Sequence, residues 1–220
     1  MDLNNDSLIE KLHIAVERFK ALARKTHPKC DEEHDNGEWE LDYIEFGDMV
    51  SAALDVTERL KPEEVPSDTI DEILYTIARD NECMSVIEEL NSEWYSFLCK
   101  AVLNTQYINA KWQFAECLKK HAEVEEIKPL IFEFLKSGNE YIERMALESL
   151  AILYPDKAEE YAEMFWNRNA YEQDEYQKIM ALHTLYKIGS PKLSYYLDLA
   201  DNSPYEYLRM NAREIRNKQF

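Results

Sequence analysis

A motif near residue 140 recurs along the C-terminal half of the chain at a spacing typical of helical repeats. Residues 138–155 read GNEYIERMALESLAILYP and residues 174–191 read DEYQKIMALHTLYKIGSP; both contain a Tyr, Met-Ala-Leu and a Leu three residues further on. The central alanines, Ala146 and Ala181, are 35 residues apart, Phe114 stands 32 residues before the first, and Ala212 stands 31 after the second. Four copies at a period of 31–35 residues predict a helical solenoid, in which each unit buries its apolar face against its neighbours.

Apolar residues at helical spacing, separated by breakers such as Gly138, Pro155 and Gly189, predict about twelve helices. The predicted ranges are 7–25, 40–60, 67–80, 82–90, 92–103, 107–121, 124–136, 140–154, 157–167, 174–188, 192–200 and 205–218. The expected fold class is therefore all-α, a right-handed α-solenoid of about five or six antiparallel helix pairs. Residues 92–220 carry the repeats, while residues 1–91 are either divergent repeats or a cap, and we expect one continuous domain.

The second helix of each predicted pair resembles a HEAT repeat, whose pattern places a basic residue shortly before an Ala and a Leu four residues after it. The basic residue stands three positions before the key position in Lys111, Lys178 and Arg209, and two before it in Arg144. The resemblance covers roughly residues 92–220. It implies a superhelical scaffold that presents a concave wall, formed by the second helices, to a partner.

The chain is strongly acidic, with 44 Asp and Glu residues against 25 Lys and Arg residues and a net charge of −19. Such a field repels phosphate, so nucleic acid and anionic membranes are poor partners, whereas a basic protein would be attracted. The sequence contains no apolar run of about 18 residues and its first residues lack the features of a secretory signal. We therefore expect a cytoplasmic protein.

The cysteine and histidine patterns predict no metal site and no cofactor. The four cysteines form no CxxC pair, so we expect reduced thiols, three of them on helices as small hydrophobic residues. Cys30 and His34 lie in an acidic stretch, but two ligands are too few for zinc, and a calcium loop in this register would need a Glu where Tyr43 stands. His13, beside the apolar stripe of the first helix, is predicted to be a partly buried structural residue.

Two rows of positions on the second helices avoid the predicted buried Ala and Leu residues and are our candidate partner-binding residues. The rows are Trp112, Arg144, Ile179 and Met210, and, one helical turn further on, Glu116, Glu148, His183 and Glu214. Three carboxylates and a histidine beside a Trp and an Arg suit a basic protein partner. A small acidic protein with these features is expected of an immunity protein that neutralises a basic toxin. Alternatively, the apolar members of these rows pack between repeats and the glutamates are merely solvated.

We expect no catalytic residues, because no nucleophile motif, phosphate-binding glycine loop or HExxH is present. Glu148 and His183 offer an acid–base pair across repeats, but without a nucleophile. A catalytic alternative is a HEAT-like DNA glycosylase, a class whose wall carries Trp, Asp and Arg; Trp112, Arg144 and Trp166 invite that comparison, although the net charge opposes DNA binding. A third alternative is a regulatory scaffold or lyase-like chaperone.

Overall fold

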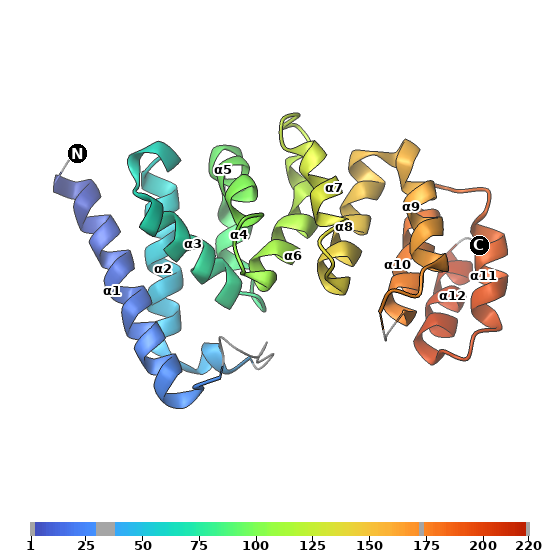
Figure 1. Cartoon of the computed structure of the whole chain (residues 1–220), viewed down its shortest axis with the longest axis horizontal. Helices are drawn as coiled ribbons and strands as arrows, with labels where there is room; N and C mark the ends of the chain where they lie inside the picture. The colour runs from blue at the N-terminus through green and yellow to red at the C-terminus, as the bar shows by residue number, and fades with distance from the viewer. Residues whose placement is uncertain (1–2, 30–37, 172–173, 219–220) are drawn as a thin grey trace. The chain divides into compact units, whose positions relative to one another are not determined.

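The computed structural model describes residues 3–29, 38–171 and 174–218, and this part of the chain forms only helices, turns and connecting segments (Figure 1). The prediction of an all-helical fold is thereby confirmed. The described α-helices are α1 (Leu3–Thr26), α2 (Ile44–Arg59), α3 (Ser67–Arg79), α4 (Ser85–Glu89), α5 (Ser92–Val102), α6 (Ile108–Cys117), α7 (Ile131–Phe134), α8 (Glu140–Leu153), α9 (Pro155–Asn167), α10 (Glu175–Lys187), α11 (Leu193–Asp201) and α12 (Glu206–Lys218). Short 3-10 helices are η1 (Glu38–Asp42), η2 (Pro62–Glu64), η3 (Leu118–His121) and η4 (Lys128–Leu130).

The chain divides into two compact units, residues 1–114 and 115–220, with the division inside α6. The boundary predicted near residue 91, between an N-terminal portion of divergent repeats or a cap and the HEAT-like repeats, falls within the first unit. The presence of repeats on either side of this boundary stays a prediction. The arrangement of the helices as a solenoid of antiparallel pairs, and the HEAT resemblance, also stay predictions.

Aromatic packing around Phe19 forms the core of the first unit, where α1 packs against α2 and α3. Phe19 is fully buried, and its ring centroid lies 5.7 Å from that of Trp39, 6.0 Å from that of Phe46 and 6.4 Å from that of Tyr75. The stripe predicted for α1 consists of Leu8, Leu12, Ala15, Phe19 and Leu22. Its first four members are buried and Leu22 is half-buried, because residues spaced by three and four positions share one side of a helix.

Buried polar groups of α5 bond to backbone carbonyls of the same unit. The indole Nε1 of Trp94 donates to the carbonyl oxygen of Leu60 at 2.8 Å, and the Tyr95 hydroxyl donates to that of Phe114 at 2.6 Å. These bonds satisfy aromatic polar groups that would otherwise be costly to bury.

In the second unit, α10 packs against α8, α9, α11 and α12. The central alanines of the predicted repeats, Ala146 on α8, Ala181 on α10 and Ala212 on α12, have no exposed surface. A methyl side chain lets a neighbouring helix approach closely, so larger residues at these positions would push the helices apart. Their predicted burial is confirmed.

The helix breaks follow the predicted breakers. Asn139 caps α8 by accepting hydrogen bonds from the backbone N–H groups of Tyr141 at 3.0 Å and Ile142 at 3.2 Å, directly after Gly138 with φ of +75°. Pro155 is the first residue of α9, where its missing N–H leaves no helical bond unmade. Gly189, with φ of +65°, follows the end of α10.

Several local predictions are wrong. The range 124–136 contains only the single turn of α7, preceded by η4, and the range 40–60 is divided into η1 and α2. Cys83 lies exposed in the turn before α4, whereas Cys99 and Cys117 are buried on helices as predicted. His13 is exposed rather than partly buried, and its Nδ1 lies 2.6 Å from Glu72 Oε1.

Candidate functional site

One side of three helices of the second unit brings most of the predicted binding residues together. We call this surface the α8–α10–α12 face. It consists of Tyr141, Arg144, Glu148 and Ala151 on α8, Tyr176, Met180, His183 and Lys187 on α10, and Tyr207, Met210, Asn211 and Glu214 on α12. On α8 and α10 these positions follow one another at spacings of three and four residues, and on α12 Met210 and Asn211 lie three and four residues after Tyr207, so the residues of each helix share one side.

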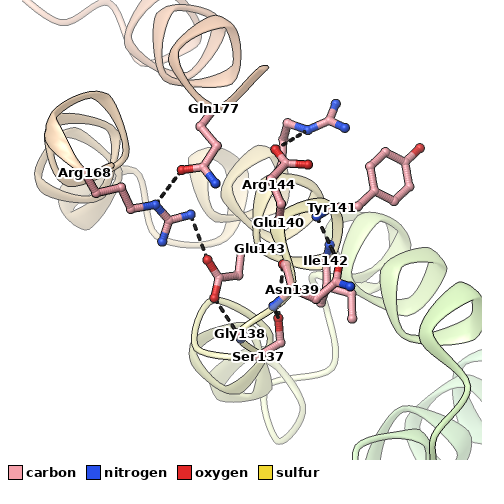
Figure 2. Close-up of polar contacts among 10 residues, drawn as sticks. All are labelled: Ser137, Gly138, Asn139, Glu140, Tyr141, Ile142, Glu143, Arg144, Arg168 and Gln177. Atoms are coloured by element: carbon pink, nitrogen blue, oxygen red, sulfur yellow. Dashed lines mark hydrogen bonds and ion pairs between the residues drawn. The ribbon is translucent and has the colours of Figure 1, made fainter. Parts of the chain in front are cut away.

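Arg144 joins α8 to α10 on this face. Its Nε donates to Glu140 Oε1 at 3.0 Å, and its guanidinium carbon lies 4.6 Å from the ring centroid of Tyr141 and 5.3 Å from that of Tyr176 (Figure 2 shows Arg144, Glu140 and Tyr141). Such cation–π contacts stabilise by about 0.5–1 kcal/mol at exposed sites.

Lys178 repeats this arrangement on α10. It pairs with Asp174, four residues earlier, and its Nζ lies 5.6 Å from the ring centroid of Tyr205. Arg144 and Lys178 are two of the basic residues on which the HEAT resemblance rests. Each pairs with an acidic residue at the start of its own helix, and each lies near the ring of a tyrosine at the start of the next helix of the face.

A groove with a volume of about 440 Å³ lies between α8 and α10 on this face. Its lining includes Glu148, Ala151, Met180, His183, Thr184 and Lys187. The exposed lining is mainly apolar, and Tyr186 also contributes to it. This composition is typical of sites that bind an apolar group in a defined orientation.

Two carboxylates of the predicted row pair with the same lysine. Lys119 on η3 lies 2.5 Å from Glu148 Oε1 and 3.9 Å from Glu116 Oε1, measured from its Nζ. Two of the three predicted carboxylates are therefore partly neutralised within the unit, whereas the third, Glu214, is exposed on α12.

His183 is paired along the face instead of with Glu148. Its Nε2 lies 2.8 Å from Asn211 Oδ1 on α12, while Glu148 is held by Lys119. Both residues line the groove, but the acid–base pair considered from the sequence is not formed.

The remaining members of the first row differ in exposure. Trp112 is only 7% exposed and belongs to the first unit, Ile179 is half-buried, and Met210 is exposed. Burial of Trp112 indicates a packing role for this side chain, which is the alternative that the sequence left open. Trp166, the other tryptophan of the glycosylase comparison, is also buried, with its ring 5.1 Å from that of Tyr196. Both indoles are therefore largely shielded from solvent.

A buried polar network connects α8 and α10, two of the helices that carry the face. Arg168, after the end of α9, lies 2.7 Å from Glu143 Oε2 through its Nη2 and donates from its Nε to Gln177 Oε1 at 2.5 Å (Figure 2). The other Glu143 oxygen accepts from the backbone N–H of Gly138 at 2.9 Å. One guanidinium thus connects α8, α9 and α10 near the starts of α8 and α10.

Two aromatic residues, Phe165 and Tyr171, lie beside this network. The Arg168 guanidinium carbon lies 3.6 Å from the ring centroid of Phe165, and burial, followed by the nearby Glu143 carboxylate, raises the pKa of Tyr171. The sequence analysis missed these residues, since their types and spacing follow no motif.

The negative charge is unequally divided between the two units. Residues 1–114 contain 25 acidic and 11 basic residues, a formal charge of −14, whereas residues 115–220 contain 19 and 14, a charge of −5. Most of the field that would attract a cationic partner therefore originates in the first unit, while the candidate face belongs to the second.

No group of three or more His, Cys, Asp or Glu side chains within the described ranges is arranged to hold a metal ion. The Cys30 and His34 pair considered from the sequence lies outside the described residues. Among the described helices, none is both long and apolar enough to cross a membrane.

The chain matches no known protein family, no curated protein and no solved structure.

Proposed function

We propose that this protein is a non-catalytic binding module that captures a basic protein partner. The observation that carries the proposal is the net charge of −19, of which the first unit holds −14 against −5 for the second. The negative field of such a chain raises the association rate of a cationic partner, and it repels nucleic acid and anionic membranes.

The second unit supports the proposal with side chains suited to protein contact. Tyr, Met and Arg are enriched in the centres of protein interfaces, and the α8–α10–α12 face presents Tyr141, Tyr176, Tyr207, Met210 and Arg144. Its residues include five of the eight predicted from the sequence, namely Arg144, Glu148, His183, Met210 and Glu214. Of the other three, Glu116 and Ile179 belong to the same unit and Trp112 belongs to the first unit.

The class of protein that best fits is an immunity protein, which neutralises a basic toxin by binding it tightly. A helical-repeat scaffold of the HEAT type would suit this role, because stacked helices offer an extended surface without a catalytic centre. Fast, charge-steered capture is an advantage for such a protein, since the toxin must be bound before it acts.

Affinity capture from the native lysate, followed by mass spectrometry, would supply a partner whose binding is then measured with purified proteins. We expect a partner with a pI above 9 and an association rate that falls about tenfold or more between about 20 mM and 150 mM salt. A rate that does not depend on salt would contradict the proposal. So would tight binding of duplex DNA in a gel-shift assay at low salt, which instead favours the glycosylase alternative.

A further inference from the structure

The α8–α10–α12 face exposes more large apolar and aromatic surface than a solvated helix needs. Tyr207 is 57% exposed, Met210 46%, Tyr176 39% and Tyr141 38%. Such side chains gathered on one side of neighbouring helices, with polar groups around them, mark contact surfaces for other proteins.

The groove between α8 and α10 supplies a recess in this surface. Its mainly apolar lining includes Met180 and Ala151, and its volume of about 440 Å³ is enough for a bulky side chain such as Leu, Met or Phe. Met180 is unbranched and flexible, so its side chain can adjust to the shape of an inserted group. The recess therefore resembles the pockets that receive an anchor residue at an interface.

Several side chains beside the groove are already paired with one another. Arg144 lies over both Tyr141 and Tyr176, His183 Nε2 lies 2.8 Å from Asn211 Oδ1, and Lys119 Nζ lies 2.5 Å from Glu148 Oε1. Side chains that are already paired lose less conformational entropy when a partner binds beside them, and this favours affinity.

The basic side chains of the face do not prevent a cationic partner from binding there. Arg144 and Lys119 are paired with Glu140 and Glu148, so neither adds an uncompensated positive charge. Lys187 stands at the rim, but the exposed Glu214 balances it on the same face. The unit that carries the groove is itself acidic, with 19 acidic against 14 basic residues in the range 115–220, so it attracts a cationic partner.

We infer that the α8–α10 groove is the anchor pocket for the basic partner, receiving one bulky apolar side chain from a cationic segment of that protein. This inference rests on the proposed function and adds to it the place of contact and the kind of residue recognised.

Two fluorescent peptides of about 18 residues, long enough to form a helix on binding, test the inference on the full chain. Both carry the same number of lysines; one has leucines along one side and the other has glutamines at those positions. We expect the leucine peptide to bind more tightly by fluorescence anisotropy. Met180→Gln should weaken its binding by about tenfold or more, the loss expected when an apolar side chain is no longer buried, and should leave the glutamine peptide unaffected.

Met164→Gln is the matched control, because Met164 is 45% exposed on α9 and does not line the groove. Equal losses with Met180→Gln and Met164→Gln would overturn the inference while leaving capture of cationic partners intact. If neither peptide binds at low salt, the proposed function itself fails.

Two further measurements guard against an unfolded variant or another occupant. A photoreactive leucine analogue in the first peptide should crosslink to residues 148–151 or 180–187 of the unaltered protein, and crosslinks confined to other residues would contradict the groove assignment. Light scattering should show the same mass for the original protein and Met180→Gln; a dimer that dissociates on this substitution would show that a second copy occupies the groove, and would overturn the inference.

Discussion

Arg168 Nη2 lies 2.7 Å from Glu143 Oε2, and the two side chains are only 18% and 5% exposed. The pair connects the segment after α9 to the first turn of α8, while Arg168 Nε holds Gln177 on α10. This ion pair therefore helps to hold α8 and α10, two of the three helices of the candidate face, in their relative position.

Breaking this pair from one side should destabilise the protein strongly. Arg168→Met leaves the Glu143 carboxylate buried without its cation, and we expect a loss of about 3–5 kcal/mol in the free energy of unfolding, measured by urea denaturation. The double variant Glu143→Gln with Arg168→Met should be less destabilised than Arg168→Met alone. Lys128→Met is the control, because its partner Glu125 is 82% exposed and the surface pair contributes little. Equal effects of Arg168→Met and Lys128→Met would contradict the structural role of the buried pair.

Enlarging a core alanine should test the close approach of the helices in the second unit. Ala181 on α10 has no exposed surface, so Ala181→Leu must displace neighbouring side chains and should cost about 1–3 kcal/mol of stability. Ala21→Leu, at an exposed position of α1, adds the same atoms without this crowding. Thermal or urea unfolding compares the two variants. A neutral Ala181→Leu would mean that α10 is not closely packed at this position.

The contact of His13 with Glu72 should make the imidazole titrate at higher pH than usual. The hydrogen bond to the Glu72 carboxylate, followed by its charge, raises the pKa of His13 above the ordinary 6.5. Because the folded-state pKa is the higher one, the stability from this contact is fully present below pH 6.5 and is lost as the pH rises through the folded-state pKa.

NMR titration of the histidine ring protons measures this effect. Glu72→Gln should lower the pKa of His13 toward its ordinary value and leave that of His121, which burial lowers, unchanged. An unaltered His13 titration in Glu72→Gln would show that the contact is absent in solution.

The described cysteines should differ sharply in reactivity. Burial raises the pKa of Cys99 to about 12, so almost no thiolate forms at neutral pH, whereas Cys83 is exposed before α4. In the Cys30→Ser background, iodoacetamide should modify Cys83 in the native protein and Cys99 only after unfolding, as followed by peptide mass spectrometry. Rapid native labelling of Cys99 would mean that α5 is not packed as described.

The helices were predictable because their signals are local. Apolar residues at three- and four-residue spacing, with Gly138, Pro155 and Gly189 at the breaks, placed α8, α9 and α10 within two residues of their observed ends. The same spacing identified Ala146, Ala181 and Ala212 as buried. The 124–136 range was wrong, since its apolar spacing suits a helix but the structure forms only η4 and one turn of α7 there.

The candidate site was only partly predictable. The sequence identified Arg144, Glu148, His183, Met210 and Glu214 as one face, since residues one turn apart lie on one side of a helix. It did not reveal the partner that each side chain finds on another helix. Arg168 is 25 residues from Glu143, and Lys119 is 29 residues from Glu148, so no local pattern relates them.

The amino-acid sequence by itself determined the helical class of this protein, most of its helix boundaries and its net charge of −19. Tertiary structure alone decided which carboxylates are neutralised, that Trp112 is buried, and that a groove opens between α8 and α10. The physical reason is that helix formation depends on neighbours within one or two turns, whereas charge pairing and exposure depend on how side chains far apart in the sequence pack against one another.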